Sequence, residues 1–74
     1  MRLHVELEDG KAETVFVPAA AMREANDLDL EGIDFTIYVA WRTWHRKGWT
    51  DLESWEDFAE VAWITAAETD DPKA

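Results

Sequence analysis

Five tryptophans in a chain of 74 residues constrain this sequence more than any other feature. They stand at Trp41, Trp44, Trp49, Trp55 and Trp63. A domain of this length has little interior, because the fraction of surface that folding buries falls as chains become shorter. Indoles are also seldom buried completely. We therefore expect part of the aromatic surface to stay open for a partner, which indicates a binding module rather than an enzyme.

Composition places the chain among small globular domains. Its hydrophobic fraction of 47% is typical of globular proteins and too high for a wholly disordered chain. The longest apolar runs are far too short for a membrane-spanning helix, and the alternating start, residues 1–6, lacks the apolar block of a signal peptide. Cysteine is absent, so neither disulfides nor thiolate metal sites are expected. The default expectation is a cytosolic protein.

The net charge of -10 comes from 17 acidic and 7 basic residues. A field of this sign does not attract nucleic acid or anionic lipid, so neither is expected as a partner. The simplest interpretation is a solvated acidic surface that keeps an aromatic-rich chain in solution. The acids also suit a basic partner, or a DNA mimic that competes for a nucleic-acid-binding site.

The first seventeen residues predict a β-hairpin. Leu3, Val5 and Leu7 alternate with polar residues, and a second β-rich stretch covers residues 12–17. Asp9-Gly10 between them is the strongest short-range hairpin signal. A two-residue loop would pair Leu7 with Ala12, Val5 with Thr14 and Leu3 with Phe16. The apolar face of this hairpin should pack on helices, since a lone hairpin is marginal in water.

Helices are expected after Pro18. Residues 19–26 contain strong helix formers, and an acidic connection, residues 27–32, leads to a central helix over residues 33–47. Gly48 suits the left-handed position that ends this helix. On one side of the central helix fall Ile33, Ile37, Ala40, Trp41 and Trp44, and on the other fall Phe35, Tyr38 and Val39. Apolar residues on both sides indicate burial on both sides, or one side in the fold and one against a partner.

A last helix is expected from Ser54, which we prefer over Thr50 as the N-cap, to about Ala67. This helix should bury Trp55, Phe58, Ala59 and Ala62. The whole is then α+β: an N-terminal β-hairpin followed by two or three packed α-helices, in a single domain over residues 1–67. Residues 68–74 should form a flexible acidic tail.

No catalytic, cofactor or metal site is expected. The glycines at 10, 32 and 48 are isolated, so no phosphate-binding loop exists. His4 and His45 lack local ligand partners, and Ser54 has a helix-capping explanation. Asp27, Asp29 and Glu31 alternate as in a calcium loop, but Gly32 is misplaced and the twelfth position carries no glutamate.

Basic residues cluster at Arg42, Arg46 and Lys47 among tryptophans, a combination that can stack on nucleic acid. Compensation of the helix dipole explains them better in so acidic a chain.

The stretch from Asp34 to Trp63 resembles the core of small tail assembly chaperones of long-tailed phages, especially those infecting actinobacteria. The shared pattern is an aromatic-rich helix with Ala-Trp, a basic residue and glycine at its end, a short loop, then serine, an aromatic, two acids and phenylalanine. Here these segments are residues 38–48 and 54–58. Members often also begin with a strand pair containing Asp-Gly, as at residues 9–10.

The resemblance implies a non-enzymatic chaperone, a late viral protein of the host bacterial cytoplasm. Such proteins coat the long helical tape measure protein before tail tube subunits polymerise around it, so the implied partner is that protein or another tail protein. The candidate partner-binding residues are Tyr38, Trp41, Trp44, Trp49, Trp55 and Trp63. Which of them are core and which face the client stays open, and the hairpin edge is a possible surface for self-association.

The resemblance carries one further expectation, and two other functions stay open. The resemblance implies a programmed frameshift that appends a second domain, and residues 71–73 permit a slippery codon sequence. The competing functions are a small acidic inhibitor, which would bind through its acids rather than its tryptophans, and a virion connector subunit.

Overall fold

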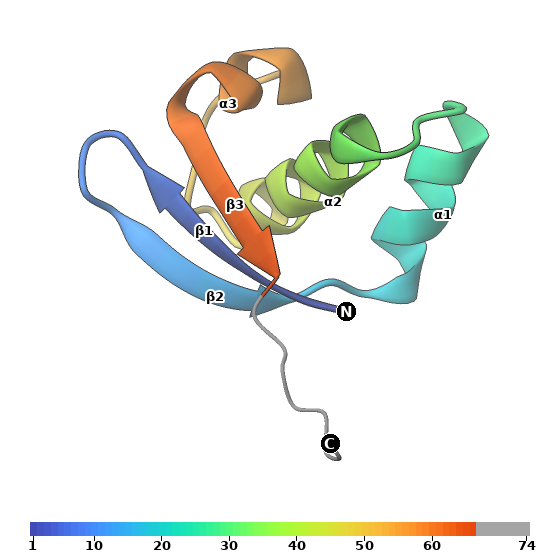
Figure 1. Ribbon diagram of the computed structural model, residues 1–74, viewed down its shortest axis with the longest axis horizontal. Helices are drawn as coiled ribbons and strands as arrows, with labels where there is room; N and C mark the ends of the chain where they lie inside the picture. Colours follow the sequence, from blue (N-terminus) through green and yellow to red (C-terminus); the bar gives the residue numbers. More distant parts are fainter. Residues whose placement is uncertain (67–74) are drawn as a thin grey trace.

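The computed structural model describes residues 1–66, in which a three-stranded antiparallel sheet is covered by helices on one face (Figure 1). The elements, in chain order, are β1 (Arg2–Leu7), β2 (Ala12–Phe16), α1 (Ala19–Asp27), α2 (Ile33–Arg46), α3 (Trp55–Val61) and β3 (Ala62–Ala66). The expected α+β class, with an N-terminal hairpin followed by helices, is confirmed. The acidic tail and the frameshift position fall outside the described residues.

The hairpin forms where Asp9-Gly10 predicts it, but its loop is longer than expected. The Gly10 N–H donates to the Leu7 carbonyl at 2.9 Å, and the Leu7 N–H donates to the Lys11 carbonyl at 2.7 Å. Gly10 has a φ of 100°. A turn closed in this way, with a left-handed glycine as its last residue, is the usual three-residue hairpin loop with a bulge.

The extra loop residue makes the predicted strand register wrong. Leu3 lies opposite Val15, and Arg2, rather than Leu3, lies opposite Phe16. Because side chains alternate along a strand, a shift of one residue moves the β2 side chains to the other face. Val15 and Val17 are therefore buried, whereas Phe16 is 69% exposed on the face away from the helices.

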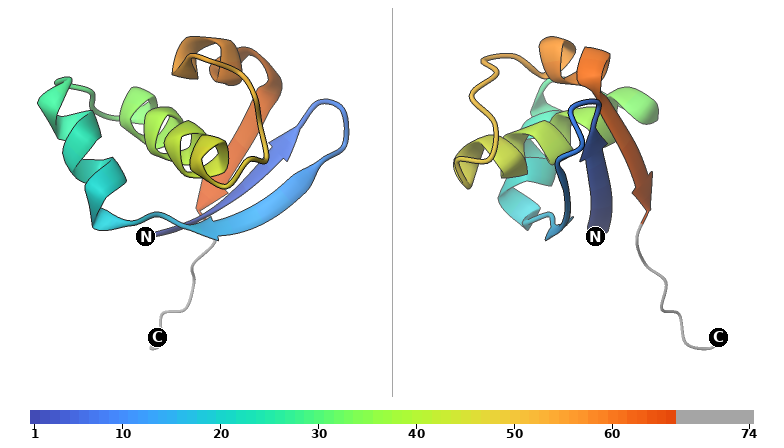
Figure 2. Two further views of the ribbon diagram at one scale, coloured as in Figure 1. Left: turned by 180° about the vertical axis from the view of Figure 1, so that it is seen from behind. Right: turned by 90° about the vertical axis from the view of Figure 1, so that its left-hand side faces the viewer.

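The last helix is shorter than predicted, and a third strand replaces its second half. α3 ends at Val61, and β3 pairs antiparallel with β1, which becomes the central strand in the order β2-β1-β3 (Figure 2). Trp63, Ile64 and Thr65 are all residues that favour strands. They also meet the open edge of β1, so local preference and tertiary pairing agree.

The predicted end of α2 at Gly48 is confirmed. Gly48 has a φ of 78°, its N–H donates to the His45 carbonyl at 3.1 Å, and the Trp49 N–H donates to the Trp44 carbonyl at 3.0 Å. This pair of bonds is a Schellman motif. The Trp44 and Trp49 rings meet edge to face at 5.6 Å and add the apolar contact that accompanies such caps.

Ser54 is the N-cap of α3, as predicted. Its hydroxyl oxygen accepts a hydrogen bond from the Asp57 N–H at 3.2 Å. Glu56 and Asp57 place two acids in the first turn, where they complement the helix dipole. The cap fixes the residue at which α3 begins.

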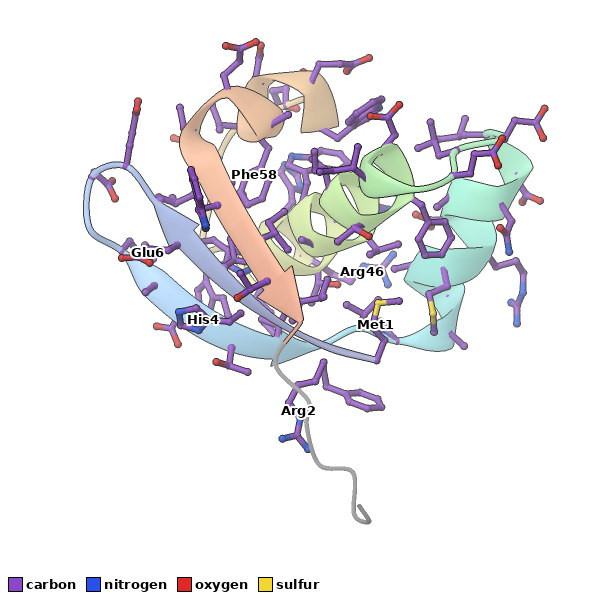
Figure 3. All side chains as sticks on the ribbon, viewed as in Figure 1. Met1, Arg2, His4, Glu6, Arg46 and Phe58 are labelled. Atoms are coloured by element: carbon purple, nitrogen blue, oxygen red, sulfur yellow. The ribbon has the colours of Figure 1, made fainter. Side chains whose placement is uncertain are left out.

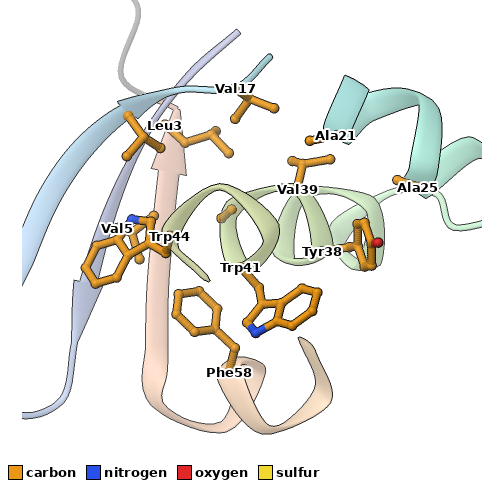
Figure 4. Packing of buried hydrophobic residues seen from close by; sticks show 12 residues of the cluster. Leu3, Val5, Val17, Ala21, Ala25, Tyr38, Val39, Trp41, Trp44 and Phe58 are labelled. Carbon is orange, nitrogen blue, oxygen red and sulfur yellow. The ribbon is translucent and has the colours of Figure 1, made fainter. Parts of the chain in front are cut away.

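The core lies between the sheet and α2, with α1 and α3 packed on α2 (Figure 4). Trp44 and Phe58 are its largest completely buried side chains, and their rings lie 5.8 Å apart. Val5 from β1 and Val39 from α2 are also inaccessible. Tyr38 and Val39, from one predicted side of α2, and Ala40, Trp41 and Trp44, from the other, are all buried. Ile33, in the first turn of α2, is instead 74% exposed.

Candidate partner-binding site

Three of the aromatic residues named as candidates lie in the core. Tyr38 and Trp41 are each 9% exposed, and Trp44 is inaccessible. The Trp41 indole N–H donates to the Leu52 carbonyl at 2.9 Å and ties the α2–α3 connection to α2. The part of the α2 face that carries Trp41 and Trp44, which the sequence left open between core and client, is therefore core.

Trp49 and Trp55 are half-buried and pack against this core. Trp49 also joins the hairpin to the end of α2, because Lys11 Nζ donates to its carbonyl at 2.8 Å. Lys47 Nζ lies 5.3 Å from the centre of the Trp49 ring, within range of a cation–π contact. Both indoles hold the fold together and leave only part of their surface to solvent.

Trp63 differs from the other tryptophans, because it is 74% exposed. It lies on β3 opposite Glu6 of β1. Since Leu3 and Val5 point into the core, Glu6 and Trp63 point to the face of the sheet that the helices do not cover. Of the candidate residues, Trp63 offers the largest free aromatic surface.

A hollow of about 710 Å³ runs between β3 and the beginning of α2. Ile33, 74% exposed, and Met1, 45% exposed, stand beside it with Trp63. Ile37 and Ile64 complete its apolar lining. We call this hollow the β3–α2 groove. The sequence places Ile33 on an apolar stripe of α2 but does not mark it as a site residue. The signal that could identify Ile33 as a site residue is its position in the first turn of the helix, too far from the core to be buried.

A second hollow, of about 590 Å³, lies at the hairpin end of β3. Glu6, Glu8 and Glu60 line it together with Trp63, and we call it the acidic hollow. None of the three glutamates forms an ion pair within residues 1–66. Arg2 lies at the other end of β1 from the hairpin turn, as Figure 3 shows for Arg2 and Glu6. The charged side chains near β3 are therefore negative at its hairpin end and positive at its other end.

The basic residues of α2 are partly engaged with α1. Glu24 accepts hydrogen bonds from Arg42 Nε at 3.0 Å and from the Tyr38 hydroxyl at 3.1 Å. Arg46 Nη2 lies 3.8 Å from Glu24 Oε2 and forms a second ion pair. Burial, and then the hydrogen bond to Glu24, raise the pKa of Tyr38 above its ordinary value. With Trp41 and Trp44 also buried, this cluster lacks the open stacking surface that single-stranded nucleic acid requires.

No group of three or more histidine, aspartate or glutamate side chains in the described part of the chain is placed to hold a metal ion. Among the described helices, none has the length and apolarity needed to span a membrane.

Comparison with protein families, curated proteins and solved structures finds no match for this chain.

Proposed function

We propose that this protein is a non-enzymatic tail assembly chaperone of a long-tailed phage, which binds the tape measure protein in the host cytoplasm during tail morphogenesis. The observation that carries the binding role is the exposure of Ile33 beside the β3–α2 groove and of Trp63 on the strand that forms its other wall. Exposed apolar side chains gathered at a concave surface mark interaction sites. The tape measure protein as partner comes from the resemblance of residues 34–63 to such chaperones.

The apolar surface at the groove is large enough to matter for binding. A tryptophan side chain buries about 150–250 Å² when fully covered. With 74% of Trp63 exposed, a partner that covers half of that area gains about 1.5–2 kcal/mol, at roughly 25 cal/mol per Å². Loss of this contact alone should weaken binding about tenfold to thirtyfold.

Co-expression with the tape measure protein encoded by the same phage tests the function. Trp63→Thr and Ile33→Thr should each reduce its capture at least about tenfold while leaving circular dichroism and the melting temperature nearly unchanged. Phe16→Thr is the matched control, because Phe16 is also large, apolar and 69% exposed but lies away from the groove. It should leave capture unchanged.

Other results would select other functions. If Glu6→Gln, Glu8→Gln and Glu60→Gln together abolish binding while Trp63→Thr does not, the acidic inhibitor is the better description. Incorporation of the protein into finished virions would instead indicate a connector subunit. Failure to capture the tape measure protein with the unmodified chain would refute the chaperone role.

A further inference from the structure

We infer that β3 is an open sheet edge at which the partner adds an extended strand, with a lysine or arginine of that strand beside Trp63. The strand pairs with β3, places its inward side chains in the β3–α2 groove and its cation at the acidic hollow. This deepens the proposed function in that it presupposes a partner protein, but it does not require that the partner be a tape measure protein.

The backbone groups of Ile64 in β3 point away from β1. Within residues 1–66, β3 pairs only with β1, and the Glu8 N–H donates to the Val61 carbonyl at 2.9 Å. Hydrogen-bonded pairs alternate along an antiparallel ladder, so Trp63 bonds to β1 and Ile64 does not. The N–H and C=O of Ile64 therefore point away from the sheet, toward the open edge.

The exposed backbone groups of Ile64 determine which conformation of the partner fits the edge. A partner that covers the groove also removes water from the Ile64 N–H and C=O. A helix has no free backbone groups along its length to replace that water, and each buried group left without a partner costs about 1–3 kcal/mol. An extended segment supplies a carbonyl and an N–H at the required spacing. The edge thus favours a strand over a helix.

The strand β3 lacks the features that usually keep edge strands from pairing with another chain. Natural edge strands usually carry charged residues, proline or bulges. The five residues of β3, Ala-Trp-Ile-Thr-Ala, include none of these. The other edge strand, β2, carries Glu13 in its second position. Of the two edges, β3 is the one suited to accept another strand.

The charges at the two ends of β3 indicate the orientation of the added strand. At the beginning of β3 the acidic hollow holds three glutamates that form no ion pair within the described chain, and the Trp63 ring beside them can stack on a cation. At the other end of β3, the groove is lined by Met1 and by Arg2, whose guanidinium is positively charged. Antiparallel pairing is the more stable arrangement, so the cation should lie toward the C-terminal end of the added strand.

The same charges disfavour a second copy of this chain as the occupant. Each copy carries a net charge of -10, and its own β3 contains no lysine or arginine to place in the acidic hollow. Two copies joined at β3 would repel each other through this net charge. A basic partner strand satisfies both the edge and the hollow.

Binding of designed peptides to the full chain tests the orientation. The probe is a capped ten-residue peptide of alternating valine and threonine with two lysines at its C-terminal end. The control peptide has the same composition with the lysines at the N-terminal end. In an NMR titration of the ¹⁵N-labelled protein, the first peptide should bind at least fivefold tighter and slow hydrogen exchange of the Ile64 amide. Equal affinity of the two peptides would overturn the assignment of the cation to the acidic hollow.

Position 64 tests the strand pairing itself. Ile64→Pro removes an N–H that β1 does not use, and proline is tolerated at such edge positions. Ile64→Ala is the control, because it also loses the isoleucine side chain but keeps the N–H. Ile64→Pro should bind the lysine peptide at least tenfold more weakly than Ile64→Ala. If the proline variant does not fold, a synthetic chain with an ester in place of the Ile64 amide removes the same donor. Unchanged binding in either would overturn strand addition.

Three outcomes separate this inference from the chaperone role. Peptide binding that depends on the Ile64 N–H, without capture of the tape measure protein, supports strand addition and refutes the chaperone role. Capture of the tape measure protein that survives loss of the Ile64 N–H supports the chaperone role and refutes strand addition. A tighter complex with an amphipathic helical peptide, or a dimer that the Ile64 ester dissociates in analytical ultracentrifugation, would show that a helix or a second copy occupies β3, and would overturn the inference.

Discussion

Replacing Gly48 with the two mirror-image forms of alanine should have opposite effects on stability. Gly48 has a φ of 78°, and a Cβ added there would meet nothing within 4 Å. Any penalty for Gly48→Ala therefore arises between the new Cβ and the local backbone at this φ, and not from a clash with neighbouring residues. An L-residue in the left-handed region costs about 1–2 kcal/mol, which corresponds to a fall in melting temperature of about 4–16 °C for a domain of this size.

D-alanine at the same position removes that penalty. Its preferred φ is positive, and its Cβ narrows the conformations of the unfolded chain, a gain of about 0.4–1 kcal/mol for a compatible substitution. The D-alanine chain should thus melt above the unmodified protein, and the L-alanine chain below it. Both variants are accessible by chemical synthesis, and thermal unfolding followed by circular dichroism measures the difference. If D-alanine destabilises as much as L-alanine, the Schellman cap at Gly48 does not form.

Two further predictions concern the core and the α1–α2 contact. Trp44→Ala should reduce the free energy of unfolding by about 3–5 kcal/mol, since the side chain is inaccessible, and Trp63→Ala should cost far less; urea unfolding measures both. The single tyrosine, Tyr38, should ionise only above its ordinary pKa, followed by absorbance at 295 nm, and Glu24→Gln should bring its pKa back down. Because the folded pKa is the higher one, this group's contribution to stability is complete below about pH 10 and declines as pH rises through the folded value. An ordinary tyrosine titration, or equal costs for the two tryptophans, would contradict the described packing.

Local chemistry predicted the ends of the helices well. Gly48 and Ser54 each act within a few residues of their own position, through a left-handed backbone and a side-chain cap. Asp9-Gly10 located the hairpin for the same reason. Features of this kind depend on neighbours in sequence, so they can be inferred without knowing the tertiary structure.

Features that depend on distant partners could not be inferred in the same way. The hairpin register turned on whether the Asp9-Gly10 loop has two or three residues, and both loops suit this dipeptide. The C-terminal segment contains alanines that continue a helix and Trp63, Ile64 and Thr65 that favour a strand. Pairing with β1 decides between them, and that contact spans most of the chain.

The tryptophan count indicated a binding surface but did not locate it. Tyr38, Trp41 and Trp44 lie on α2, which is enclosed by the sheet and by both other described helices, so their rings form the core. Small size limited the interior less than expected, because a single central helix can bury several aromatics when elements pack on most of its sides. Surface aromatic area then remains chiefly where no helix covers the sheet, at Phe16 and Trp63.

The strand Ala62–Ala66 determines both the fold and the candidate site. If residues 62–66 continued α3, β1 would be an edge strand and the groove beside Ile33 would lack its second wall. As a strand, the segment completes the sheet on one side and presents on the other the Ile64 N–H and C=O, which pair with no strand within residues 1–66. Its lack of charge would be a liability for an isolated protein, since open edges promote aggregation. The net charge of -10 offsets this by repelling other copies of the chain, and the acids at the hairpin end of β3 attract a basic partner strand.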